Sequence, residues 1–261
     1  MDIKEIYEKS TELTNTTVKK PLFMVMFYIQ IMGLLISQIG TFFGFLGLFI
    51  SSIMSYVLLH GLVCASLKAI NGREIDINED GRCGFRRFFE LLKTYGWMYV
   101  IRLVVMAILL MVPVIILISQ MFNFAELQSF SFVQELELET MMRRYILITM
   151  ACEFIANILV NFVYFPTAYL IETQKLCGLK ALKAGFKLLK KNRKYLFRLE
   201  MQYLSYMVIF LYLEFYLAVF VDNMLVIPFT FILYGLEAYM YGVHYQISHA
   251  YLFLEMEGER Q

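Results

Sequence analysis

Long apolar stretches separated by short polar segments make up most of the chain. A helix that crosses a membrane needs about 20 apolar residues, because each residue rises about 1.5 Å and the hydrocarbon layer is about 30 Å thick. By this measure the sequence predicts an all-α, polytopic transmembrane bundle of six helices, with residues 1–261 forming a single membrane domain. The predicted spans cover about residues 22–39, 42–67, 95–121, 145–171, 195–221 and 225–253.

Composition agrees with this pattern. Hydrophobic residues make up 60% of the chain and charged residues 17%, whereas a soluble domain has roughly 45–50% apolar and about 25% charged residues. The formal net charge of +1 argues against a nucleic-acid partner, which would require a basic surface. The charged first 20 residues do not resemble a cleavable signal peptide. Gly40 and Thr41 are expected to form a tight reversal between the first two spans.

Basic residues are distributed unevenly among the polar segments. The N-terminus, the loops after spans two and four and the C-terminal tail together hold 19 Lys and Arg residues, and the segments on the opposite side hold 2. Because Lys and Arg concentrate in cytoplasmic loops, we expect both termini to be cytoplasmic. The sequence therefore predicts a multi-pass protein of the plasma (cell) membrane.

Two cytoplasmic segments, residues 85–94 and 173–194, are predicted to form amphipathic interfacial helices. In the second, steps of three and four residues place five lysines on one helical face, with an apolar stripe of Leu179, Leu182, Phe186 and Leu189 beside them. Such a helix can bind anionic lipid or a protein partner. It can equally serve as an anchor that only fixes the topology. The lysines are Lys180, Lys183, Lys187, Lys190 and Lys194.

The chain resembles a group of uncharacterised bacterial six-span integral membrane proteins, related to the membrane domain attached to some glycerophosphodiester phosphodiesterases. Three stretches carry the resemblance: residues 66–74 (SLKAINGRE), residues 165–169 (FPTAY) and residues 178–190 (GLKALKAGFKLLK). The resemblance implies the six-span fold. It implies no phosphodiesterase activity, because the sequence contains no soluble phosphodiesterase domain.

Several polar residues fall inside the predicted spans, where an ionisable side chain costs about 3 kcal/mol or more and must face a partner or a cavity. Depth along the helices predicts a polar site near the membrane midplane in which Arg102 opposes Glu237 or Glu153. The alternative is a structural ion pair with hydrogen bonds that hold the bundle together. The candidates are Arg102, Glu153, Asn157, Asn161, Glu237, Tyr241 and His244.

No cofactor or metal site is predicted. The three histidines lack the spacing of a metal motif. The four cysteines contain no C-x-x-C pair, and we interpret them as packing residues rather than ligands or bridges. The segment over residues 122–144 carries four acids, and both strand and helix patterns fit it.

Three functions remain open. The first is a transport-related or accessory membrane subunit, indicated by the polar midplane residues. The second is a non-catalytic scaffold that binds anionic lipid, a membrane protein partner or a second copy of itself through the basic helices. The third, an enzyme acting on lipid within the membrane, lacks a catalytic constellation. A cavity that reaches Glu237 or Glu153 would favour the first, and a fully packed bundle would favour the second.

Overall fold

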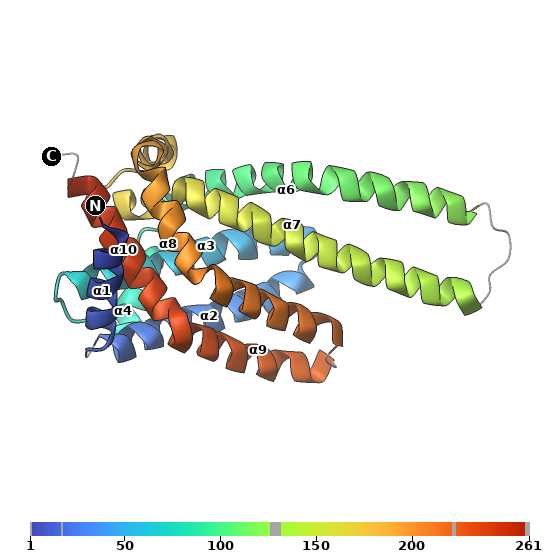
Figure 1. Ribbon diagram of the computed structural model, residues 1–261, viewed down its shortest axis with the longest axis horizontal. Coiled ribbons are helices and arrows are strands. Elements are labelled where there is room, and N and C mark those ends of the chain that lie inside the picture. Colours follow the sequence, from blue (N-terminus) through green and yellow to red (C-terminus); the bar gives the residue numbers. More distant parts are fainter. Residues whose placement is uncertain (1, 17, 126–131, 221–222, 259–261) are drawn as a thin grey trace.

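The computed structural model describes residues 2–16, 18–125, 132–220 and 223–258, and every regular element in these ranges is helical (Figure 1). The elements are α1 (Ile3–Thr14), α2 (Lys19–Phe42), α3 (Gly44–Ile70), α4 (Ile77–Gly81), α5 (Cys83–Arg86), α6 (Phe88–Ala125), α7 (Phe132–Thr173), α8 (Gly178–Phe220), α9 (Asn223–Glu237), a π-helical turn (Ala238–Gly242) and α10 (Val243–Gly258).

Four helical segments of the described chain are long and apolar enough to cross a membrane. They are Lys19–Gly40, Ile50–Ile70, Phe88–Ile116 and Arg143–Thr173, and they correspond to the first four predicted spans. The predicted fifth span lies in the second half of α8. The predicted sixth is divided among α9, the π-helical turn and α10. Length and composition therefore indicate a membrane protein.

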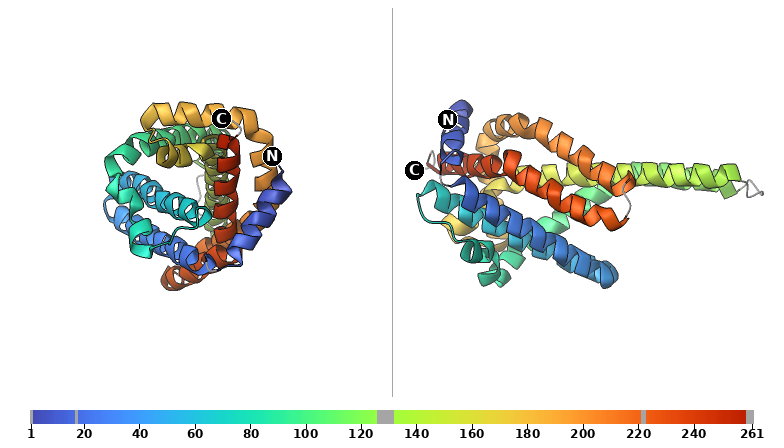
Figure 2. Two further views of the ribbon diagram at one scale, coloured as in Figure 1. Left: turned by 90° about the vertical axis from the view of Figure 1, so that its left-hand side faces the viewer. Right: turned by 90° about the horizontal axis from the view of Figure 1, so that it is seen from below.

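The two termini lie at the same end of the molecule, and α6 and α7 project far beyond the other helices at the opposite end (Figure 1). Short helices gather around the end with the termini (Figure 2). There α1 packs against α10 with Ile3 and Ile6 buried, while α4 and α5 pack against α3. The short helices α1, α4 and α5 thus share the end of the bundle that carries the termini.

The first part of α8 runs across this end of the bundle before the helix turns along it (Figures 1 and 2). Its inner face buries Ala181, Leu182, Leu188 and Leu189 against the other helices. Gly185 lies where α8 crosses α7, and a Cβ atom there would come within 2.3 Å of the Thr167 hydroxyl oxygen. The crossing therefore requires a residue without a side chain.

Several predicted boundaries differ from the structure. The reversal between α2 and α3 occurs at Phe43, not at Gly40 and Thr41, because α2 continues to Phe42. The predicted helix over 85–94 is divided between α5 and α6, and α6 then continues into the apolar segment without a break. The predicted helix over 173–194 begins at Gly178. In the acidic segment 122–144, residues 126–131 lie outside the described residues, and α7 begins at Phe132.

Candidate functional site

A cavity of about 570 Å³ lies among α2, α3, α6, α7, α8 and the helices near the C-terminus. Its lining includes four ionisable side chains together with amide, hydroxyl and aromatic groups. Six of the seven polar candidates from the sequence line it: Arg102, Glu153, Asn157, Asn161, Glu237 and Tyr241. Residues that are separated by more than 130 positions in the chain therefore border one space.

An ion pair between α6 and α7 forms one wall of the cavity. Arg102 Nη2 donates a hydrogen bond to Glu153 Oε1. The Arg102 side chain is only 16% exposed, whereas that of Glu153 is 49% exposed. Asn157 and Asn161 follow Glu153 at successive four-residue steps, which is one helical face, and both line the same cavity. Of the two partners predicted for Arg102, the structure places Glu153 beside it.

The π-helical turn over Ala238–Gly242 also borders the cavity, through Tyr241 and Gly242. Tyr241 lies in this turn, and its hydroxyl donates a 2.8 Å hydrogen bond to Glu237 Oε1. Single π-helical turns inside α-helices occur frequently at functional sites, because the extra residue changes the direction of the side chains around it. No apolar pattern in the sequence marks such a turn.

Glu200 is not among the candidates predicted from the sequence. In the structure Glu200 lines the cavity. Its carboxylate lies 2.9 Å from His249 Nε2 and accepts a hydrogen bond of 3.2 Å from the Tyr245 hydroxyl. The four-residue step between Tyr245 and His249 places both on one face of α10. That spacing was the available signal for the cluster.

A smaller cavity of about 190 Å³ adjoins the first and shares Asn161, Glu200 and Tyr245 with it. It extends past Tyr95, whose hydroxyl lies 2.7 Å from His60 Nδ1. Polar groups therefore continue from the Arg102–Glu153 pair towards the end of the molecule that carries the termini.

His244 lies outside the lining of both cavities. Its Nε2 atom lies 2.9 Å from the Thr11 hydroxyl oxygen, and its Nδ1 atom is hydrogen-bonded to the Tyr203 hydroxyl. The residue therefore joins α1 to the rest of the bundle. The seven-residue step from Glu237 would place His244 on the same face of a regular helix. The π-helical turn lies between the two residues and changes this register.

All five lysines of the predicted basic face are exposed on α8. The apolar stripe predicted beside them is divided. Leu182 and Leu189 are buried against the bundle, whereas Leu179 and Phe186 are about half exposed. The stripe was predicted as one surface, but part of it packs inside the protein because α8 lies directly on α7.

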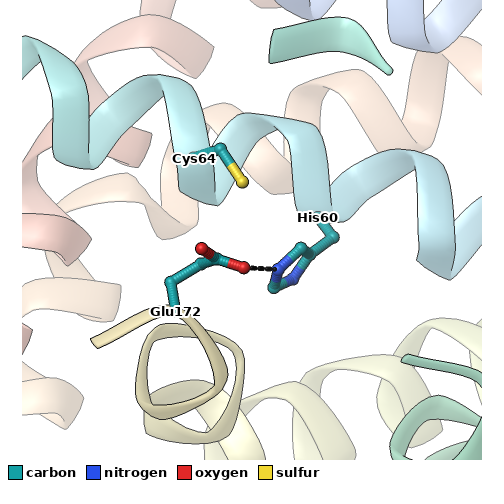
Figure 3. A group of neighbouring side chains, drawn as sticks. All are labelled: His60, Cys64 and Glu172. Carbon is teal, nitrogen blue, oxygen red and sulfur yellow. Dashed lines mark hydrogen bonds and ion pairs between the residues drawn. The ribbon is translucent and has the colours of Figure 1, made fainter. Parts of the chain in front are cut away.

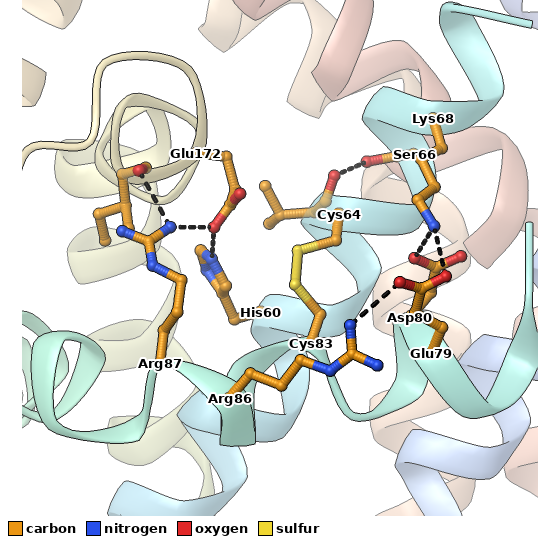
Figure 4. The surroundings of a disulfide bond; sticks show 12 residues. His60, Cys64, Ser66, Lys68, Glu79, Asp80, Cys83, Arg86, Arg87 and Glu172 are labelled. Atoms are coloured by element: carbon orange, nitrogen blue, oxygen red, sulfur yellow. Dashed lines mark hydrogen bonds and ion pairs between the residues drawn. A yellow bond between two sulfur atoms is a disulfide. The ribbon is translucent and has the colours of Figure 1, made fainter. Parts of the chain in front are cut away.

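A second polar cluster lies near the termini and involves two cysteines (Figure 4). Cys64 and Cys83 are joined as a disulfide, whereas Cys152 and Cys177 are free. The interpretation of all four as packing residues is therefore wrong for this pair. The physical reason is that α5 folds back on α3, and spacing along the chain does not reveal such a contact.

No known protein-family model, curated protein or solved structure matches this chain. The resemblance based on residues 66–74, 165–169 and 178–190 therefore stays a prediction.

Proposed function

We propose that the chain is a transport-related membrane protein with six spans and cytoplasmic termini, and that its central cavity binds a polar, positively charged solute. The second half of α8 and the α9–α10 segment supply the fifth and sixth spans in this proposal. The orientation is supported by the basic segments, which gather with both termini at one end (Figure 1). Lys and Arg favour the cytoplasmic side of a membrane.

The cavity is the observation that carries the proposal. A bundle held together only by packing has no need of about 570 Å³ of space bordered by ionisable groups, because charges within a membrane are costly and are generally retained for function. Three carboxylates and one guanidinium line it. Arg102 is paired with Glu153 and Glu200 contacts the His249 imidazole, so Glu237, hydrogen-bonded to Tyr241, is the carboxylate that a bound cation would neutralise. A cation complements such a site.

Aromatic rings favour an organic cation over a metal ion in this cavity. Tyr56, Tyr241, Tyr245 and Phe154 are among the lining residues, and a cation near an aromatic face gains about 0.5–2 kcal/mol. Tetraphenylphosphonium is a suitable probe because it carries one positive charge on an apolar body. Its binding to the purified protein in detergent can be measured by equilibrium dialysis.

We expect saturable binding that Glu237→Gln weakens at least tenfold. Glu74→Gln is the matched control, because Glu74 is exposed in the polar loop after α3 and does not line the cavity. Absence of saturable binding, or equal affinity in wild type and Glu237→Gln, would contradict the proposal.

The basic face of α8 favours a second candidate function, that of a scaffold. Its five lysines are exposed, and the half-exposed Leu179 and Phe186 lie on the same helix. Each basic residue near an anionic membrane surface contributes about 1 kcal/mol of attraction. Replacing all five lysines by glutamine should then abolish retention of anionic lipid through purification. Tetraphenylphosphonium binding should persist in that variant if the cavity acts independently.

A further inference from the structure

Three chemically distinct metal-ligand types meet where α3 faces the last turn of α7. We name His60, Cys64 and Glu172 the α3–α7 cluster. His60 and Cys64 are one helical turn apart on α3 and point towards Glu172 (Figure 3). One ligand atom from each residue lies within 4.8 Å of the other two. The imidazole is 1% exposed and the thiol 8%, so the cluster is shielded from solvent.

Imidazole nitrogen, cysteine sulfur and carboxylate oxygen are the three donor types that bind Zn²⁺ in proteins. Bonds of about 2.0–2.3 Å in a tetrahedron place neighbouring ligand atoms roughly 3.5 Å apart. His60 Nε2 and Glu172 Oε1 are 2.8 Å apart, and the remaining separations, up to 4.8 Å, can close by small side-chain rotations.

The neighbours of the cluster are those expected around a metal. A metal-bound histidine generally uses its other ring nitrogen in a hydrogen bond that fixes the ring. His60 Nδ1 lies 2.7 Å from the buried Tyr95 hydroxyl. Arg87 Nη1 donates a hydrogen bond of 2.6 Å to Glu172 Oε1. The positive charge of Arg87 would balance the net negative charge of a divalent ion bound by one carboxylate and two thiolates, those of Cys64 and Cys83.

Cys83 can supply a fourth ligand. Its sulfur is bonded to that of Cys64 in the structure (Figure 4), so it lies next to a member of the cluster. Gly84 makes this approach feasible, because a Cβ atom there would come within 1.9 Å of the Val57 carbonyl oxygen. We propose that the α3–α7 cluster, joined by Cys83 once its bond to Cys64 is reduced, binds a divalent transition-metal ion of the zinc class.

Opening the Cys64–Cys83 disulfide requires a reductant, which we identify as a cytosolic thiol of the glutathione class. Two such thiols become one disulfide as the Cys64–Cys83 bond is converted into two protein thiols. Binding of the metal then releases both thiol protons, because thiolate is the ligand form. The inference depends on the proposed cytoplasmic location of this end, where thiols stay reduced. It does not depend on the function of the cavity.

Cobalt titration of the purified full-length protein in detergent tests the proposal. After reduction with a phosphine and removal of metal, we expect one equivalent of Co²⁺ to give the visible bands of a tetrahedral complex and a sulfur-to-cobalt charge-transfer band. Zn²⁺ should displace the cobalt. Cys64→Ser should weaken the charge-transfer band, because Cys83 is then the one sulfur ligand left, whereas the matched control Cys177→Ser should leave the band unchanged, because Cys177 is an exposed free cysteine.

Two further measurements keep the test decisive if Cys64→Ser fails to fold. Zn²⁺ should protect Cys64 and Cys83 of the wild-type protein from alkylation, detected by mass spectrometry, while Cys177 reacts at an unchanged rate. Tyr95→Phe should weaken Zn²⁺ binding about 10–100-fold, the usual effect of losing a hydrogen bond to a metal ligand. Absence of the charge-transfer band in the reduced wild type, or alkylation of both cysteines unaffected by Zn²⁺, would overturn the proposal. Tetraphenylphosphonium binding measured on the same sample reports separately on the cavity.

Discussion

Neutralising Glu153 should destabilise the protein by leaving the Arg102 guanidinium without its counter-charge. Removing one partner of a buried ion pair costs about 3–5 kcal/mol. The cost here should be lower, about 2 kcal/mol, because the Glu153 side chain is 49% exposed and glutamine retains a hydrogen-bond acceptor. For a chain of this length 1 kcal/mol corresponds to about 2–4 °C. Glu153→Gln should therefore lower the melting temperature by about 4–8 °C.

Thermal unfolding in detergent, followed by differential scanning fluorimetry, measures this change. Glu237→Gln is the matched control and should change the melting temperature by less than about 3 °C, because it alters one hydrogen bond with Tyr241. The double variant Arg102→Gln/Glu153→Gln should recover most of the loss, since residues in contact are not additive. Equal shifts in the two single Glu variants, or strict additivity in the double variant, would refute the assignment of the pair.

Three further predictions concern the fold around the site. Gly185→Ala should lower the free energy of unfolding by about 1–3 kcal/mol through overpacking, measured by thermal unfolding. Adding Thr167→Ala should partly restore that stability, because the nearest contact of the new Cβ atom is the Thr167 hydroxyl. Hydrogen bonds, above all the one from the Glu79 backbone N–H, hold the pKa of Asp76 below its usual value. The Asp76 cap therefore stabilises α4 above about pH 4, and this stabilisation is lost as the pH falls below that value. Proteolysis of the loop around α4 should accelerate only under those acidic conditions. Exposed Cys177 should react with an impermeant maleimide in inverted membrane vesicles and stay unlabelled in intact cells, and the reverse pattern would contradict the proposed orientation.

Much of the fold could be predicted because membrane-spanning helices are specified by local composition. The apolar segments locate α2, α3, α6 and α7, and the basic residues locate the end with the termini. The pattern of apolar residues could not reveal where helices bend or where their regular hydrogen bonding is interrupted. Examples are the π-helical turn over Ala238–Gly242 and the bend of α8 (Figure 1), which apolar periodicity does not encode.

The position of the candidate residues along their helices could be predicted, but not which of them pair between helices. Periodicity placed Glu153, Asn157 and Asn161 on one face, and the structure places that face against the cavity. Depth alone left Arg102 with two candidate partners, because it contains no information on which helices are neighbours. The same limitation concealed the contact of Cys64 with Cys83, which depends on the close approach of α5 to α3.

The length of α6 and α7 has a mechanical consequence. Their 38 and 42 residues correspond to about 57 and 63 Å of helix, roughly twice the thickness of the hydrocarbon layer. The Arg102–Glu153 pair joins these two rods, and α7 continues for about 32 Å on the far side of Glu153. The far part of these two helices projects beyond the other helices (Figure 1), so a force on it would act on the contacts between α6 and α7, the Arg102–Glu153 pair among them.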